Sequence, residues 1–290
     1  MYTYTVVIPH HNIPNLLERC LNSIPTRGDI QIIIVDDNSN TDVVDFERFP
    51  GLDRQNTKVI FNKEPKGAGH ARNLALEHAE GKWLVFADAD DFFTQDAFAI
   101  MDQYSDCMAD LVLFKIKSVM SDTLAPADRD GSMINQYIDG YFNGKYSKER
   151  VSFINEAPWA KMVSNELVAK KDIKFDEVRY SNDIMFSTKV TCNSSEIVIA
   201  KEAIYIITLR DGSLTFDCKT NPENFLSRME VKIRRNQYLK KHRKERPFLL
   251  LNVIDAKQIS LQTAIKTLSM ILSKRLLFDG MSYYLRNRKS

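Results

Sequence analysis

The sequence predicts an α/β protein whose mostly parallel sheet is covered by helices on both faces and followed by a helical, basic C-terminal extension. Short apolar runs such as 31–35 (QIIIV) and 83–87 (WLVFA) alternate with helical patterns early in the chain. Such runs are typical of strands in parallel sheets with helices on either side. Residues 228–290 hold 16 Lys and Arg against 4 Asp and Glu, a balance of +12, whereas the preceding residues hold 24 and 34, a balance of −10. This division of charge indicates a basic C-terminal region that meets an anionic partner.

The predicted strands are short apolar runs bounded by turn-forming residues. They are expected at residues 2–9, 31–35, 58–61, 82–87 and 111–117, with two more within 196–209. Helices are expected after Pro14, where apolar residues recur at helical spacing, and after the turn 67–69 (GAG). A basic helix is expected at 224–241, and a helical pair or one long helix at 248–278.

Two segments and two domain boundaries complete this organisation. Residues 121–144 are rich in Asp, Gly and Ser and lack a clear period, which predicts an excursion or a mobile loop. Residues 158–183 predict a compact mixed unit. The expected domains are residues 1–220, with halves at 1–115 and 116–220, and a helical basic region at 221–290.

Composition excludes several classes of protein. With 290 residues, 44% of them hydrophobic, the chain can bury a full core. No apolar run is long enough to cross a bilayer, and the N-terminus lacks the basic start and cleavage site of a signal peptide. The four cysteines are scattered without a Cys-x-x-Cys pair, which argues against a zinc site and a disulfide framework. We therefore expect a cytoplasmic location.

Polar clusters follow the ends of four predicted strands. They are His11 and Asn12, Asp36 and Asp37, residues 66–69, and residues 88–91. The carboxyl ends of parallel strands meet at one edge of a sheet, where such proteins bind their ligands. The sequence therefore predicts one binding site that these four clusters share.

The last of these clusters contains paired carboxylates. If the chain stays extended, Asp88 and Asp90 lie on one face. Two adjacent carboxylates repel each other unless a cation lies between them, and an all-oxygen pair suits Mg²⁺ or Mn²⁺. The alternative is a polar strand end at which Asp91 or Thr94 caps the next helix.

The order of four motifs, VVIPHHN, IIIVDDNSN, GAGHARN and FADADD, resembles that of the family-2 glycosyltransferases of the bacterial surface-glycan type, which have a GT-A (Rossmann-like) fold. The resemblance covers about residues 3–215. Residues 159–162 (WAKM) resemble the family's Trp-Asn-Lys-Leu segment, residues 182–186 (NDIMF) its Glu-Asp-x-x-Phe, and residues 210–215 its Arg-x-Gly-Ser segment. The chain departs from the family at Asn182, where a glutamate is usual.

The resemblance implies a nucleotide-sugar donor, with UDP favoured, in the half 1–115. Asp37 would accept a hydrogen bond from the uracil N3–H, and Asp90, with Asp88, would bind Mn²⁺ or Mg²⁺. The expected donor-binding residues are Pro9, His11, Asp37, Lys66, Gly67, Arg72, Asp88 and Ala89. Two alternatives stay open: Asp37 can form a helix cap or an Asx-turn with Ser39, and Arg72 can be an ordinary surface residue. Asp36 is expected to be structural.

The resemblance also implies a catalytic base and an acceptor site in the half 116–220. Asp183 would take the proton from the acceptor hydroxyl, so that one displacement inverts the anomeric centre. Its alternative role is a helix N-cap. The acceptor-side candidates are Trp159, Lys161, Arg210 and Ser213. Trp159 can stack on a sugar or lie in the core.

We therefore expect a metal-dependent, inverting glycosyltransferase that extends a cell-surface glycan on a glycan or lipid-linked acceptor. The basic residues 228–246, with Met229, Ile233 and Leu239 as apolar anchors, suit the anionic inner face of the cytoplasmic membrane. The alternative is a solvated helix packed on the catalytic domain. Nucleic acid is not expected as a partner, and residues 278–285 suit an interfacial end or a homodimer contact.

Two other functions remain open at this point. A sugar-phosphate nucleotidyltransferase shares the sheet and the paired carboxylates, but it would place a Gly-rich phosphate loop after the first strand, where this chain has His10, His11 and Asn12. A non-catalytic binding module would use only the basic tail, so substitutions at Asp90 or Asp183 would leave its activity unchanged.

Overall fold

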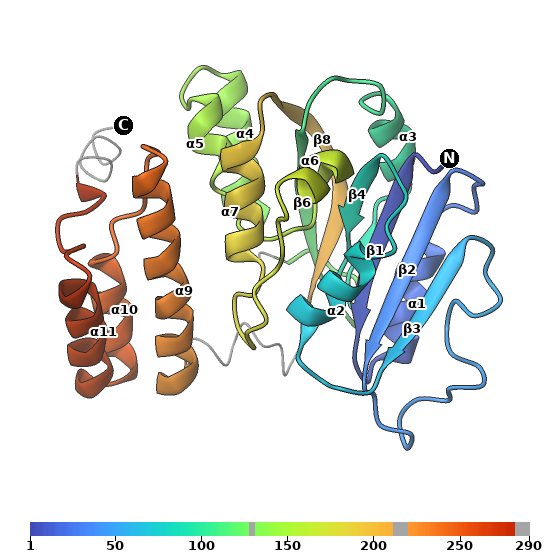
Figure 1. The fold of residues 1–290 in the computed structure, drawn as a ribbon, viewed down its shortest axis with the longest axis horizontal. Coiled ribbons are helices and arrows are strands. Elements are labelled where there is room, and N and C mark those ends of the chain that lie inside the picture. Colours follow the sequence, from blue (N-terminus) through green and yellow to red (C-terminus); the bar gives the residue numbers. More distant parts are fainter. Residues whose placement is uncertain (128–130, 211–219, 282–290) are drawn as a thin grey trace. The chain divides into compact units, whose positions relative to one another are not determined.

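The computed structural model describes residues 1–127, 131–210 and 220–281 (Figure 1). The chain divides into two compact units between residues 210 and 211. The first unit contains the sheet and the second is helical. The sheet of the first unit has the strand order β3-β2-β1-β4-β7-β6-β8-β5. Its strands are β1 Tyr4–His10, β2 Ile30–Asp37, β3 Thr57–Asn62, β4 Trp83–Phe86, β5 Phe92–Phe93, β6 Leu111–Met120, β7 Lys161–Ser164 and β8 Ile197–Leu209.

The sheet is parallel in its N-terminal half and mixed beyond it. Strands β3, β2, β1 and β4 pair in parallel, as the sequence predicts. Strand β7 is antiparallel to both β4 and β6, whereas β8 is parallel to β6 and antiparallel to β5. The parallel half therefore brings the ends of β1, β2 and β4 to one edge, which positions the site described below.

Helices cover both faces of this sheet. They are α1 Pro14–Asn22, α2 Ala68–Leu76, α3 Ala97–Asp102, α4 Gly131–Phe142, α5 Lys148–Ser152, α6 Asn165–Lys170 and α7 Ile184–Asn193. Helices α1 and α2 lie on opposite faces of the parallel half (Figure 1). Every residue of β1 and β2 is buried, which explains why their sequences are almost uninterrupted apolar runs.

An aromatic cluster joins the sheet to the segment that leads into α7. The rings of Phe175 and Phe186 stack with centroids 3.9 Å apart, and Phe86 of β4 meets both edge-on at 5.2 Å. Such pairs add to the free energy of burial of their apolar surface. The cluster holds the start of α7 beside the end of β4.

Two sequence predictions about this unit are wrong. Residues 121–144, predicted as an excursion or loop, contain the helix α4, which buries Ile134 and Ile138 one turn apart; tertiary packing thus outweighs their polar composition. Residues 196–209, predicted as two strands, form the single strand β8, because the register of its partner β6 shifts between Leu113 and Ile116 and lets the pairing continue.

The second unit is a helical pair packed on a longer helix. Its helices are α9 Pro222–Lys241, α10 Leu251–Ile259 and α11 Leu261–Ser273. Ser260 is extended and its hydroxyl accepts a hydrogen bond from the backbone N–H of Thr263, so the predicted helical segment 248–278 is a pair and not one long helix. Arg246 binds Asp279 through two hydrogen bonds of 2.6 and 2.9 Å. Among the residues that the structure describes, no helix is both long and apolar enough to cross a membrane.

The close approach of Gly81 to β1 generates a stability prediction. A Cβ at Gly81 would lie 2.5 Å from the backbone N of Thr5 and the carbonyl carbon of Tyr4. Because backbone cannot move aside cheaply, we expect Gly81→Ala to lower the free energy of unfolding by about 2 kcal/mol or more, measured by urea denaturation. The control is Gly28→Ala, since a Cβ there meets nothing within 4 Å. Equal stability of the two variants would contradict this packing.

Candidate active site

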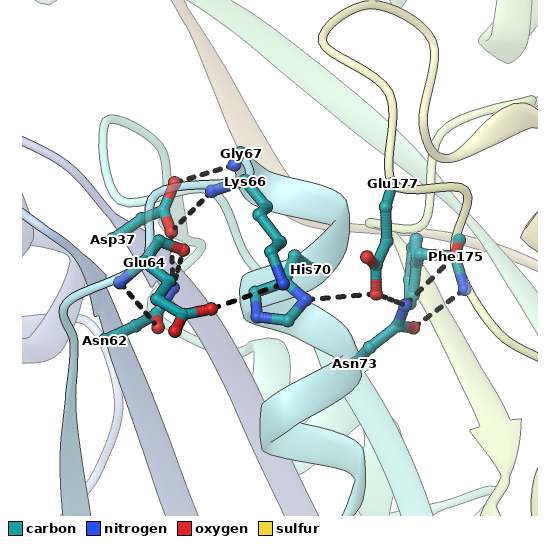
Figure 2. Close-up of polar contacts among 9 residues, drawn as sticks. All are labelled: Asp37, Asn62, Glu64, Lys66, Gly67, His70, Asn73, Phe175 and Glu177. Atoms are coloured by element: carbon teal, nitrogen blue, oxygen red, sulfur yellow. Dashed lines mark hydrogen bonds and ion pairs between the residues drawn. The ribbon is translucent and has the colours of Figure 1, made fainter.

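Asp37, at the end of β2, anchors the turn that precedes α2. Its carboxylate accepts hydrogen bonds from the backbone N–H of Gly67 at 2.7 Å, the side-chain amide of Asn62 at 2.8 Å and the backbone N–H of Lys66 at 3.4 Å (Figure 2). Gly67 has a φ of +85°, a conformation that favours glycine. The N-terminus of α2 is therefore held beside the end of β2.

The neighbouring carboxylate, Asp36, has a structural role, as the sequence predicts. It accepts hydrogen bonds from the backbone N–H and the hydroxyl of Ser39. Because the backbone N–H of Ile13 donates to Nε2 of His10, the His10 proton is on Nδ1, which donates to Asp36 at 2.7 Å. Burial raises the pKa of Asp36, but these hydrogen bonds outweigh it and hold the pKa below its ordinary value. The Asx-turn with Ser39, an open alternative for Asp37, is thus formed by Asp36.

His11 lies beside Asp37. Its Nδ1 donates to the backbone carbonyl of Asp37 at 2.9 Å, and the side-chain amide of Asn12 donates to its Nε2 at 2.8 Å. Pro9 is in β1, paired in register with Val35. These residues gather at the ends of the first two strands, while the imidazole of His11 stays exposed to solvent.

Residues 88–91 form a turn after β4. The backbone N–H of Asp91 donates to the carbonyl of Asp88 at 3.0 Å, so the prediction that an extended chain aligns Asp88 with Asp90 is wrong. Ala89 is buried within the turn. Asp91 is also buried and accepts a hydrogen bond from the backbone N–H of Thr208 at 2.7 Å. Helix α3 begins at Ala97 with Asp96 at its N-cap position, so neither Asp91 nor Thr94 caps it.

Arg72 of α2 is the centre of the site. It is 5% exposed, and its guanidinium donates to Asp88 at 2.5 Å and to the side-chain oxygen of Asn182 at 2.8 Å. The guanidinium also lies over the ring of Phe175, 5.3 Å from its centroid. The alternative that Arg72 is an ordinary surface residue is therefore wrong.

Asp90 interacts with a second arginine. Arg210, at the end of β8, donates from Nε to Asp90 at 2.9 Å, and both side chains are partly exposed. The backbone carbonyl of Asp90 accepts hydrogen bonds from Arg19 and from the hydroxyl of Thr208. Arg210 thus pairs with the turn after β4. The predicted acceptor residue Ser213 lies outside the residues that the structure describes.

Asp183 occupies the N-cap position of α7, but its side chain makes no capping hydrogen bond. The capping alternative is therefore wrong. Burial raises the pKa of the Asp183 carboxyl, Arg72 partly offsets this, and the negative charges of Asp88 and Glu156 add to the increase. A half-buried carboxyl with a raised pKa can accept a proton more readily than an exposed one. The adjacent Asn182 accepts a hydrogen bond from Arg72. This contact connects the segment of Asp183 to the rest of the site.

Helix α2 packs directly on the segment that precedes Asp183. A Cβ at Gly69 would lie 2.1 Å from the carbonyl oxygen of Asp176 and 2.9 Å from the Cβ of Asn182, so only glycine allows this approach. The Asn73 side chain pairs with both the N–H and the carbonyl of Phe175, and His70 contacts Glu177 at 3.0 Å (Figure 2). Sequence reasoning missed these contacts; the glycine and asparagine of GAGHARN were their only local signals.

Two predicted acceptor residues are in the interior. Lys161 is 2% exposed and its Nζ donates to the backbone carbonyl of Asn155 at 2.8 Å. Trp159 is buried and stacks on Tyr205, with ring centroids 5.8 Å apart. We therefore correct the acceptor role of Lys161 to a structural one, since its ammonium serves a backbone carbonyl. Trp159 follows the alternative in which it lies in the core.

The residues present fit a hard divalent ion only together with a phosphate ligand. Within the described part of the chain, no three His, Cys, Asp or Glu side chains come together to hold a metal. Asp88 and Asp90 each give one oxygen to an arginine, which leaves the other oxygen of each carboxylate for coordination. Mg²⁺ and Mn²⁺ suit such a site, because they bind one or two carboxylates and take their other ligands from water and substrate phosphates.

Comparisons with known proteins agree on one family. The sequence profile described as "Glycosyl transferase family 2" matches residues 5–160. The chain is 26% identical over 249 residues to the poly(ribitol-phosphate) beta-N-acetylglucosaminyltransferase TarS of Staphylococcus aureus, a match that covers 80% of this chain and 40% of TarS. The chain therefore spans less than half the length of this relative.

Solved structures share the fold. The structure of S. aureus TarS 1–349 in complex with UDP-GlcNAc matches with a TM-score of 0.64 and 23% identity, covering 81% of this chain and 66% of that chain. The mannosyltransferase PcManGT from Pyrobaculum calidifontis, in complex with GDP-Man and Mn²⁺, matches with a TM-score of 0.52 and 17% identity, covering 98% and 80%. These similarities confirm the predicted GT-A fold.

The raised pKa of Asp183 generates a second stability prediction. A carboxyl whose pKa is higher in the folded than in the unfolded protein loses stabilisation as pH rises through that folded pKa. At neutral pH we expect Asp183→Asn to unfold at the same temperature as the parent protein or at a higher one, because the buried charge is removed. The difference in Tm should shrink as pH falls.

The matched control is Asp106→Asn, since Asp106 is exposed and its substitution should leave Tm unchanged across the same pH range. Thermal unfolding followed by circular dichroism measures both variants. A clear loss of Tm for Asp183→Asn at neutral pH would show that its carboxylate is stabilising in the folded protein, contrary to this prediction.

Proposed function

Because this chain belongs to glycosyltransferase family 2, we propose that it moves a sugar from a nucleotide-sugar donor to a hydroxyl of a glycan or lipid-linked acceptor. The donor is proposed to be UDP-linked, and the product to be a cell-surface polysaccharide. The observation that carries the proposal is the contact network around α2, which joins Asp37, Asp88 and the residue before Asp183 through Gly67 and Arg72. The proposal includes a cytoplasmic location, which the scattered cysteines favour.

The base and ribose of the donor are assigned to the ends of β1 and β2. The Asp37 carboxylate accepts hydrogen bonds from Asn62 and Gly67, which fix its direction, and each carboxylate oxygen can accept more than one donor. An imide N–H is the group of uracil that this carboxylate would recognise. His11 and Pro9 flank Asp37 and form the proposed walls of the pocket. The TarS structure with UDP-GlcNAc supports the choice of UDP.

The diphosphate is assigned to the start of α2. The helix dipole places a partial positive charge at this end, and Lys66 lies in the same turn. A Cβ at Gly67 would meet nothing within 4 Å, so the backbone there is open to close approach. Arg72 supplies a full positive charge behind the turn and keeps Asp88 in place.

Asp90, with Asp88, would hold Mn²⁺ or Mg²⁺ against the diphosphate. When bound, such an ion supplies Lewis-acid stabilisation of the negative charge on the departing nucleoside diphosphate. The PcManGT structure with GDP-Man and Mn²⁺ supports this assignment. Arg210, which pairs with Asp90, orients the carboxylate from the side of β8.

Asp183 is the proposed general base. The proton of the acceptor hydroxyl passes to the Asp183 carboxylate as the acceptor oxygen bonds to the anomeric carbon. The bond from that carbon to the diphosphate oxygen breaks, and its electron pair leaves with the nucleoside diphosphate. One displacement of this kind inverts the anomeric centre. Half-burial in the α7 start keeps the carboxylate directed and raises its pKa, which improves a base for this task.

Calorimetry tests the donor and metal assignments together. We expect UDP to bind the full chain, to bind more tightly with Mn²⁺ present, and to lose the Mn²⁺-dependent part in Asp90→Asn. The matched control is Arg210→Gln, which breaks the same ion pair but keeps the carboxylate and should keep the Mn²⁺ effect. If GDP binds and UDP does not, the proposed donor nucleotide is guanosine-based and not uridine-based. Absence of binding by both nucleotides would overturn the donor site.

Asp183 also sets an expected pH profile. Because the base must be ionised and burial raises its pKa, kcat/KM should fall as pH decreases, at a pH above the ordinary range for an aspartate. Asp183→Asn should lower kcat by about 10²-fold or more with little change in UDP affinity, measured by release of UDP from UDP-sugars in the presence of acceptor. Asp106→Asn should behave as the parent. A variant at Asp183 that retains full transfer would exclude this residue as the base.

A further inference from the structure

The second unit exposes large apolar side chains on two adjacent helices. On α10, Ile254 is 61% exposed, and on α11 Leu261, Ile265 and Leu272 are 68%, 60% and 49% exposed. We call these four residues, with the half-buried Leu268, the α10–α11 apolar face. Contiguous exposed apolar residues of this size mark a contact with a partner or a membrane.

Helix α11 exposes a row of large apolar side chains, whereas a surface helix usually turns such a row toward the core. Thr263, Ala264, Thr267 and Ile271 are its buried residues, and the Thr267 hydroxyl is satisfied by the carbonyl of Thr263 at 2.8 Å. Leu261, Ile265, Leu268 and Leu272 instead recur at spacings of four, three and four, which align them along one side of the helix. Helix α11 therefore buries two threonines and leaves its leucines exposed or half-buried.

The charge around this face is mostly positive, with one exposed acid, Asp255, beside Ile254 on α10. Residues 256–278 contain Lys257, Lys266, Lys274 and Arg275 and no Asp or Glu. Lys257 is one helical turn from Ile254 on α10, and Arg275 lies just after the end of α11. Apolar residues bordered by cations are the composition of helices that lie in the plane of an anionic bilayer surface.

The helix predicted from sequence to make this contact does not have the required face. The apolar anchors proposed on α9, Met229, Ile233 and Leu239, are all buried, at 1%, 4% and 0% exposure. Met229 and Ile233 pack in the core of the second unit with Phe225 and Ala264. The prediction of an apolar membrane contact through 228–246 is therefore wrong in its location.

We propose that the α10–α11 apolar face binds the surface of an anionic lipid bilayer, with both helices parallel to the membrane plane. A second copy of the chain fits less well, because its identical face would bring a second set of the same four cations against the first, with one exposed acid per copy, Asp255, to pair them. An anionic bilayer offers both an apolar layer and the opposite charge. This proposal concerns attachment and does not depend on the sugar-transfer chemistry.

Vesicle cosedimentation of the full chain tests it. We expect binding to phosphatidylcholine vesicles that contain phosphatidylglycerol and none to phosphatidylcholine alone. Leu261→Ser/Ile265→Ser/Leu272→Ser should lower the partition coefficient by about tenfold or more, whereas the matched control Gln262→Ala/Ser269→Ala, on exposed positions of the same helix off the stripe, should bind as the parent. Circular dichroism checks that each variant keeps its helices.

A charge variant covers the case in which the apolar variant does not fold. Lys257→Gln/Lys266→Gln/Lys274→Gln should lose binding to phosphatidylglycerol vesicles and should lose the salt dependence of that binding. Parent protein that ignores phosphatidylglycerol, or a folded apolar variant that binds like the parent, overturns the proposal. So does a dimer, seen by light scattering, that the apolar variant abolishes while vesicles bind neither protein, because the face would then join two copies.

Discussion

The arrangement of the first unit depends on one buried positive charge, the guanidinium of Arg72. Arg72 is almost fully buried and is held by Asp88, Asn182 and the ring of Phe175. A buried charge is costly unless it is paired and hydrogen-bonded, so these partners must stay together. Arg72 lies in α2, and its partners come from the turn after β4 and from the segment before α7. These three places carry the proposed donor, metal and base residues. Arg72 thus links these places through its two terminal nitrogens, although its buried Nε has no hydrogen-bond partner among the described residues.

Asn182 shows how this constraint serves chemistry. As a neutral acceptor, its side-chain oxygen takes one hydrogen bond from Arg72 without competing for the positive charge. A carboxylate at this position would share that charge with Asp88 and would add a negative charge next to Asp183. The amide therefore leaves Arg72 to pair with Asp88 and adds no negative charge that would raise the pKa of Asp183 further. The departure from the usual family glutamate is therefore compatible with the proposed role of Asp183 as the base.

The two units bury their apolar side chains in different ways. In the first, strands that are apolar on both faces are covered by helices, and the polar groups are left to the strand ends. In the second, three helices enclose a small core around Met229 and Ile271 and leave the α10–α11 apolar face outside. The excess of basic residues predicts an anionic partner for this region. The α10–α11 apolar face is the proposed contact with that partner, because the apolar side of α9 is used for packing inside the unit.

The sequence by itself determined the parallel half of the sheet and the polar ends of its strands, since alternation of apolar runs and turns is written locally in the chain. It also indicated the family through four motifs in order. Only the tertiary structure decided that Arg72 is buried, that Gly69 admits the carbonyl of Asp176, that Asp91 holds β8 and that Lys161 is internal. It also placed a helix in 121–144 and merged two predicted strands into β8. The contacts of Arg72 with Asn182, of Gly69 with Asp176 and of Asp91 with Thr208 join residues more than a hundred positions apart. No local pattern encodes which distant group satisfies a buried charge or fills a space.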